Sequence, residues 1–100
     1  MSRRFENLTM PEFYERVQNA HQEMGTTLCK KRESYGPHNL TRFGNLGIVV
    51  RASDKVERLS TLVQSGSDRS PDGDSLRDAW MDLLGYATLG LIIHDLEREE

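Results

Sequence analysis

The sequence predicts an all-α domain, a small bundle of three main helices that is completed by oligomerisation. Apolar residues recur at steps of three and four along three segments, and only three prolines occur among the 100 residues. Hydrophobic residues make up 36% and charged residues 29% of the chain, as in a globular rather than a disordered protein. At this length we expect residues 1–100 to form one domain with a modest core.

The first helix is expected to begin near Met10 and to run to about Arg32. Thr9 stands three residues before Glu12, with Pro11 between them, and this combination satisfies or removes the orphan amide donors of a first turn. Its predicted apolar face consists of Phe13, Val17, Ala20, Met24 and Leu28. A tight loop is expected after it, at Tyr35 to Asn39.

The second helix is expected from about Asn45 to Gln64. Its predicted principal apolar face consists of Leu46, Val49, Val56, Leu59 and Val63, and it is widened near the start by Ile48, Val50 and Ala52. The β-branched residues 48–50 also allow a strand, but they run directly into a helical pattern. Residues 65–73 are rich in Ser, Gly and Asp, which predicts an exposed loop between helices.

The third helix is expected to begin after a cap at Asp74 or Ser75 and to reach about Glu97. Its predicted apolar face consists of Leu76, Trp80, Leu83, Ala87 and Leu91. Beyond Leu83 the helix is apolar on nearly every side, so two other helices would leave part of it uncovered. We therefore expect a homo-oligomer, a dimer or larger.

Charge and hydropathy exclude several classes of partner. The formal net charge of −3 disfavours binding to duplex nucleic acid, which normally needs a basic excess. The longest nearly apolar stretch, residues 83–93, is about half of what crosses a bilayer, so no membrane span is expected. A lone Cys29 and the absence of a signal-peptide pattern predict a cytoplasmic protein.

Three cations follow one another on the second helix. Arg51, Lys55 and Arg58 are spaced by four and three, which predicts one line that could grip successive phosphates. The alternative is a solvated face paired with Asp54 and Glu57.

The third helix carries three aspartates at a spacing of four, Asp74, Asp78 and Asp82. Like charges at this spacing repel, so Asp78 and Asp82 suggest either a Mg²⁺ site or salt bridges to the cations of the second helix. We expect Asp74 to cap the helix rather than to join them.

A further candidate group lies at the end of the first helix. Lys31, Tyr35, His38 and Asn39 offer a charge, a stacking face and hydrogen-bonding groups for a base or sugar. Structural capping is the alternative for the basic residues. The sequence has no paired cysteines and no Gly-rich phosphate loop, so no catalytic residue is assigned.

Two sequence blocks are the most specific in the chain. They are Asp54-Lys55-x-x-Arg58-Leu59 and Asp78-x-x-x-Asp82-Leu83-x-Gly85-Tyr86-Ala87. They are accompanied by Lys31-x-x-x-Tyr35-Gly36, Asn45-x-Gly47-Ile48, Arg51 and Asp74-Ser75-Leu76. Together they resemble the nucleotide modification associated domain 1 family, found largely in bacteriophages. The third-helix block is also similar to MazG-like all-α nucleoside triphosphate pyrophosphohydrolases, which hold magnesium with acidic residues. The additional Glu-rich motif of those enzymes is missing here.

This resemblance implies a phage-type protein of the host cytoplasm that binds a nucleotide or related phosphorylated ligand, in nucleotide metabolism or modification. One alternative is a magnesium-dependent pyrophosphohydrolase. Others are a binder that sequesters a cyclic nucleotide signal of host defence, and a protein-interaction module.

Overall fold

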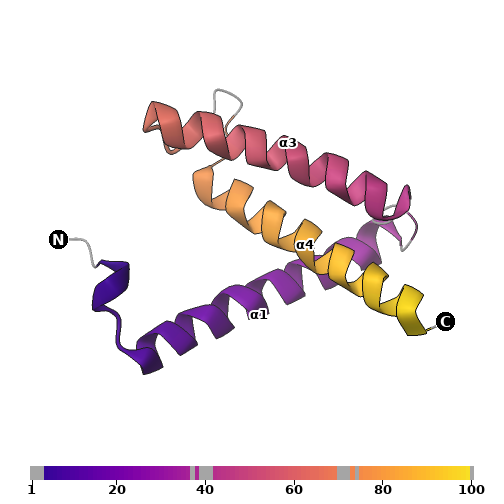
Figure 1. The fold of residues 1–100 in the computed structure, drawn as a ribbon, viewed down its shortest axis with the longest axis horizontal. Helices are drawn as coiled ribbons and strands as arrows, with labels where there is room; N and C mark the ends of the chain where they lie inside the picture. The colour runs from indigo at the N-terminus through magenta and orange to yellow at the C-terminus, as the bar shows by residue number, and fades with distance from the viewer. Residues whose placement is uncertain (1–3, 37, 39–41, 70–72, 74, 100) are drawn as a thin grey trace.

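The computed structural model describes residues 4–36, 38, 42–69, 73 and 75–99 (Figure 1). In these residues the regular elements are a 3-10 turn, η1 (Phe5–Asn7), and three α-helices, α1 (Met10–Tyr35), α3 (Gly44–Ser65) and α4 (Leu76–Glu99). The prediction of an all-α fold is confirmed. No helix among the described residues is both long enough and apolar enough to cross a membrane.

The first helix starts where its sequence predicts and ends one turn later. The Thr9 hydroxyl accepts a hydrogen bond from the Glu12 amide at 3.2 Å, and Pro11 lies in the first turn. Gly36 ends α1 at a φ of 82°, which favours glycine, and its amide donates to the Arg32 carbonyl. The last turn therefore extends beyond Arg32.

The second predicted helix is confirmed as α3, and the strand alternative for residues 48–50 is wrong. Gly66 ends α3 in the left-handed conformation, and its amide donates to the carbonyls of Leu62 and Val63. After it, the Asp68 carbonyl accepts a hydrogen bond from the Leu76 amide at 2.7 Å. This bond brings the end of α3 next to the start of α4.

The third predicted helix is confirmed as α4, with Ser75 as its capping residue. The Ser75 hydroxyl accepts from the Asp78 amide at 2.9 Å, and the Asp78 carboxylate accepts from the Ser75 amide at 3.3 Å. This is a reciprocal capping box. The alternative cap, Asp74, lies outside the described residues.

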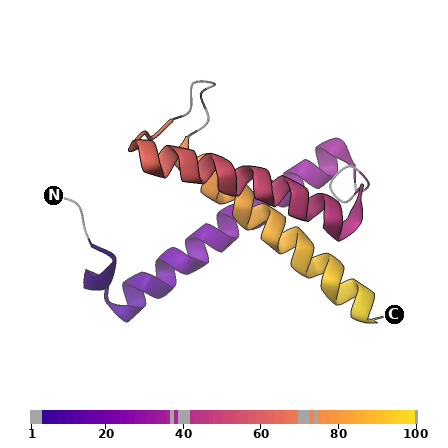
Figure 2. The same ribbon diagram turned by 45° about the horizontal axis from the view of Figure 1, so that its top comes forward.

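The helices α3 and α4 pack side by side in antiparallel directions, and α1 crosses behind them (Figures 1 and 2). The core is small. Its buried apolar side chains are Met24, Ile48, Leu59, Leu62 and Ala79. Most of them lie between α3 and α4, whereas Met24 is the buried contribution of α1.

The predicted principal apolar face of α3 is wrong except at Leu59, and Ile48, which was expected only to widen it, is buried. Leu59 is buried, but the other members of that face are more than half exposed: Leu46, Val49, Val56 and Val63. The face that packs on α4 instead carries Ile48, Lys55 and Leu62. A lysine conceals this face in the sequence, because its aliphatic stem packs while its charge is paired.

The predicted face of α4 is also largely wrong. Trp80, Ala87 and Leu91 are exposed, and the buried residues are Ala79 and Gly85. A Cβ atom built on Gly85 would lie 3.1 Å from Sδ of Met24, so a larger residue at this position would force the Met24 side chain to shift. Small residues carry no hydrophobic signal, so periodicity could not identify this face.

Candidate functional site

A cavity of about 270 Å³ opens where α1, α3 and α4 meet. Its lining comes from all three helices: Met24, Leu28, Lys31, Tyr35, Arg51, Asp82, Gly85, Tyr86 and Leu89. Three of the predicted ligand-binding residues, Lys31, Tyr35 and Arg51, are thus brought together around one space. Asp82, predicted as a metal ligand, lies in the same wall.

The helical repeat explains why α1 supplies four of these residues. Met24, Leu28, Lys31 and Tyr35 follow one another at steps of four, three and four, so they form one stripe along α1. The stripe begins in the core at Met24 and leaves it at the exposed Lys31 and Tyr35. The cavity therefore has an apolar floor and a polar, open rim.

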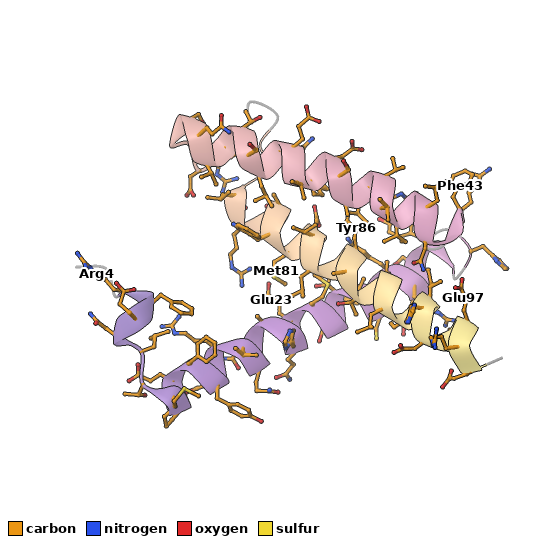
Figure 3. All side chains as sticks on the ribbon, viewed as in Figure 1. Arg4, Glu23, Phe43, Met81, Tyr86 and Glu97 are labelled. Carbon is orange, nitrogen blue, oxygen red and sulfur yellow. The ribbon has the colours of Figure 1, made fainter. Side chains whose placement is uncertain are left out.

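Two contacts join α1 to α4 where the helices cross. One is the close approach of Met24 to Gly85. The other is a bidentate ion pair, in which the two terminal nitrogens of Arg77 lie 2.8 and 2.9 Å from the carboxylate oxygens of Glu23. Glu23 lies on the side of α1 that faces α4 (Figure 3). The hydrogen bonds from Arg77 hold the pKa of Glu23 below its usual range.

Lys31 and Arg51 supply positive charge from two different helices. Within the described part of the chain, neither side chain forms an ion pair or a hydrogen bond. Both therefore keep all their donors for a bound group. Cations that converge on one cavity favour an anion with several acceptor oxygens, such as a phosphate.

Two tyrosines complete the rim with flat aromatic surface. Tyr35 is exposed at the end of α1, and Tyr86 is half-buried on the side of α4 that faces α3 (Figure 3). An aromatic face suits stacking against a base, and the phenol can donate or accept a hydrogen bond. Tyr86 was not predicted as a site residue. The signal that could have found it is its position one turn after Asp82.

The structure places the three cations of the second helix, Arg51, Lys55 and Arg58, in three different environments. Arg51 lines the cavity, and Nζ of Lys55 lies 3.0 Å from Oδ2 of Asp82. Arg58 lines a separate, open hollow of about 760 Å³ near the end of α3, together with Asp54 and Glu57. The spacing of four and three is real, but the three cations do not share one site.

The acidic line is engaged in structural contacts. Asp82 pairs with Lys55, and Asp78 belongs to the capping box, where hydrogen bonds to the side chain and backbone of Ser75 keep its pKa below its usual range. Among the described residues no three His, Cys, Asp or Glu side chains form a group that could hold a metal. Both carboxylates thus have a protein partner, and a Mg²⁺ site at Asp78 and Asp82 stays a prediction. Among the described residues, the Lys55–Asp82 pair is the kind of interhelical salt bridge that the alternative predicts.

The two remaining residues that were predicted to bind the ligand are His38 and Asn39. His38 is exposed and does not line it. Asn39 lies outside the described residues.

Comparisons with known proteins add no assignment. No family model matches the chain, and no match is found among curated proteins or solved structures. The resemblance to the nucleotide modification associated domain 1 family therefore stays an expectation from the sequence blocks.

Proposed function

We propose that the three-helix cavity binds a nucleotide or a related phosphorylated ligand. The observation that carries this proposal is the joint placement of Lys31 and Arg51, which have no partner among the described residues, beside Tyr35 and Tyr86. The cations would hold the phosphate, and the tyrosines would stack on or hydrogen-bond the base.

The size of the cavity narrows the ligand further. Its volume of about 270 Å³ is near the lower end of ligand pockets, which begin at roughly 300 Å³. A space of this size suits one base with its sugar phosphate, so a larger ligand such as a cyclic dinucleotide would extend over the open rim. The apolar floor formed by Met24, Leu28 and Leu89 would bury part of the base.

Binding without hydrolysis is the version that the geometry favours. Pyrophosphohydrolysis by analogy with MazG-like enzymes needs carboxylates that hold magnesium, but Asp82 is paired with Lys55 and Asp78 caps α4. We therefore assign no catalytic residue and no step through a metal. A phage-type role in nucleotide metabolism, or in sequestering a defence nucleotide, rests on the sequence resemblance alone.

The experiment is mass spectrometry of the purified protein incubated with a panel of nucleoside mono-, di- and triphosphates and cyclic dinucleotides. Samples with and without Mg²⁺ are compared, and bound and released species are analysed together. We expect one class of nucleotide to be retained intact without Mg²⁺. Magnesium-dependent release of monophosphate and pyrophosphate would replace the binder with an enzyme, and retention of no nucleotide would contradict the proposal.

A further inference from the structure

The pair of helices α3 and α4 carries an apolar surface on the side opposite α1. We call it the outer face. Its members are Val49, Val56 and Val63 of α3, and Trp80, Leu83 and Ala87 of α4. None of the six is charged, and together they contain the only tryptophan of the chain.

Helix geometry places the three valines on one side of α3. Each directly follows a residue that packs toward α4, because Ile48, Lys55 and Leu62 precede them. One step along a helix turns the side chain by about 100°. Arg51 lines the cavity beside α1. It comes one residue before Ala52, which helix geometry places on the side of α3 that faces α4, so Arg51 lies on the flank of α3 opposite the valines.

The same rule places the α4 residues. Trp80 follows the buried Ala79, and Leu83 follows Asp82, the partner of Lys55. Tyr86 lies on the side of α4 that faces α3 (Figure 3). Gly85, directly before it, contacts α1, so Ala87, directly after it, lies on the opposite flank of α4. Because α3 and α4 are antiparallel, the following residues of both helices point to the same side, away from α1. The ribbon agrees, with α1 behind the pair in both views (Figures 1 and 2).

The outer face is left open in the single chain. The three valines and Trp80 are each more than half exposed. A helix that buries only one flank while presenting a second apolar flank to water indicates an interaction surface.

The area of the whole chain shows that a single copy leaves enough surface exposed for an interface of homodimer size. Its accessible surface is 8000 Å², whereas a folded monomer of 11.5 kDa is expected to expose about 5,800 Å². The radius of gyration of 15.7 Å likewise exceeds the value of about 13 Å for a compact chain of this length. The excess of roughly 2,200 Å² belongs to the whole chain, α1 included, and it is sufficient for the share of one subunit in an obligate homodimer, since such interfaces bury about 2,000–5,000 Å² over both subunits.

We propose that the outer face is the interface of a homodimer, in which two copies of the α3–α4 pair pack against each other about a two-fold axis. A two-fold interface needs a self-complementary patch, and an uncharged apolar face meets this condition without any matching of charges. Small residues between the valines, Ser53 and Ser60, let the helices approach closely. The ligand cavity lies on the α1 side, so dimerisation leaves it open and the two proposals fail or succeed separately.

Trp80 provides the first test, because it is the only tryptophan of the sequence and belongs to the proposed interface. Sedimentation equilibrium and Trp80 emission are measured over a dilution series from about 100 µM downward. We expect a dimer at high concentration, and a shift to monomer on dilution that coincides with a red shift and stronger iodide quenching of Trp80. A monomer throughout, or a dimer in which Trp80 is quenched as freely as in the monomer, would overturn the proposal.

A matched pair of variants locates the interface. Val56 and Val50 are 52% and 55% exposed on the same helix, but Val50 points away from both α4 and the outer face. We expect Val56→Glu to weaken dimerisation at least 100-fold and Val50→Glu to leave it within threefold of the wild type. Glutamate has a better helix propensity than valine, so both variants should keep their helical circular dichroism. An undiminished dimer in Val56→Glu would contradict the assignment, and the dilution series decides the matter even if that variant does not fold.

Discussion

Nζ of Lys55 on α3 lies 3.0 Å from Oδ2 of Asp82 on α4. In the described part of the chain, this ion pair joins a basic residue of α3 to an acidic residue of α4. Both side chains are partly covered, with 20% and 33% of their surface exposed. The pair therefore joins two helices at the edge of the ligand cavity. Because the two charges neutralise each other, neither residue offers an unpaired charge to a ligand.

This pair should contribute measurably to stability. A double-mutant cycle with Lys55→Met and Asp82→Asn is expected to give a coupling free energy of about 1 kcal/mol, the upper end for pairs that are not fully buried. The free energies of unfolding come from urea denaturation of the two single variants and the double variant. A coupling energy indistinguishable from zero would show that the contact has no energetic role.

The Glu23–Arg77 pair predicts a loss of stability in acid. Because Arg77 lowers the pKa of Glu23 in the folded state, the contribution is fully present above the pKa of an unfolded-chain glutamate, about 4.3, and is lost as the pH falls through the lower folded value. We expect Arg77→Met to return the pKa of Glu23 toward its ordinary value and to flatten the acid limb of stability against pH. Carboxyl chemical shifts followed by NMR titration measure this change. A Glu23 titration identical in the wild type and Arg77→Met would contradict it.

Two glycines of the crossing helices should respond differently to alanine. A Cβ on Gly25 would meet nothing within 4 Å, so Gly25→Ala is expected to stabilise the protein by about 0.5–1 kcal/mol through helix propensity. At Gly85 the new Cβ would lie 3.1 Å from Sδ of Met24, which must move. The gain there should be smaller or reversed. Equal stabilisation by both substitutions, measured by thermal unfolding, would show that α1 does not press on Gly85.

The capping box at the start of α4 is expected to stabilise that helix. Ser75→Ala removes the hydroxyl that accepts from the Asp78 amide, at a cost of about 1 kcal/mol. Ser34→Ala is the matched control, because Ser34 lies within α1 and is exposed. Its stability should change by a few tenths of a kcal/mol at most. The idea fails if chemical denaturation gives the two variants the same stability.

The sequence predicts the helices well, because caps and periodicity are local properties of the chain. Thr9 and Ser75 mark starts and Gly66 marks an end, and each does so through bonds within a few residues. Which flank of a helix is buried is a tertiary property. On α3, two flanks carry enough apolar residues to be buried. The flank that is buried contains Lys55, and a lysine can lie there because its charge is paired with Asp82 of α4.

The candidate site was predictable in part for the same reason. Lys31 and Tyr35 are one helical turn apart, so their proximity follows from sequence. Arg51 joins them only because α1 crosses α4 at Gly85, and a glycine in an apolar helix gives no sign that another helix will pass there. Arg58 was grouped with Arg51 by its spacing, but it lines a different hollow.

The central claim is that Lys31 and Arg51 together hold the anionic part of a ligand. The most direct test is the affinity of the nucleotide retained by the wild-type protein, measured by isothermal titration calorimetry for Lys31→Met and Arg51→Met. Lys30→Met is the control, since Lys30 is exposed beside Lys31 and does not line the cavity. We expect each cavity variant to bind at least ~10-fold more weakly, as befits the loss of a charge-assisted hydrogen bond, and Lys30→Met to bind as the wild type does. Affinities within twofold of the wild type for both cavity variants would contradict the account.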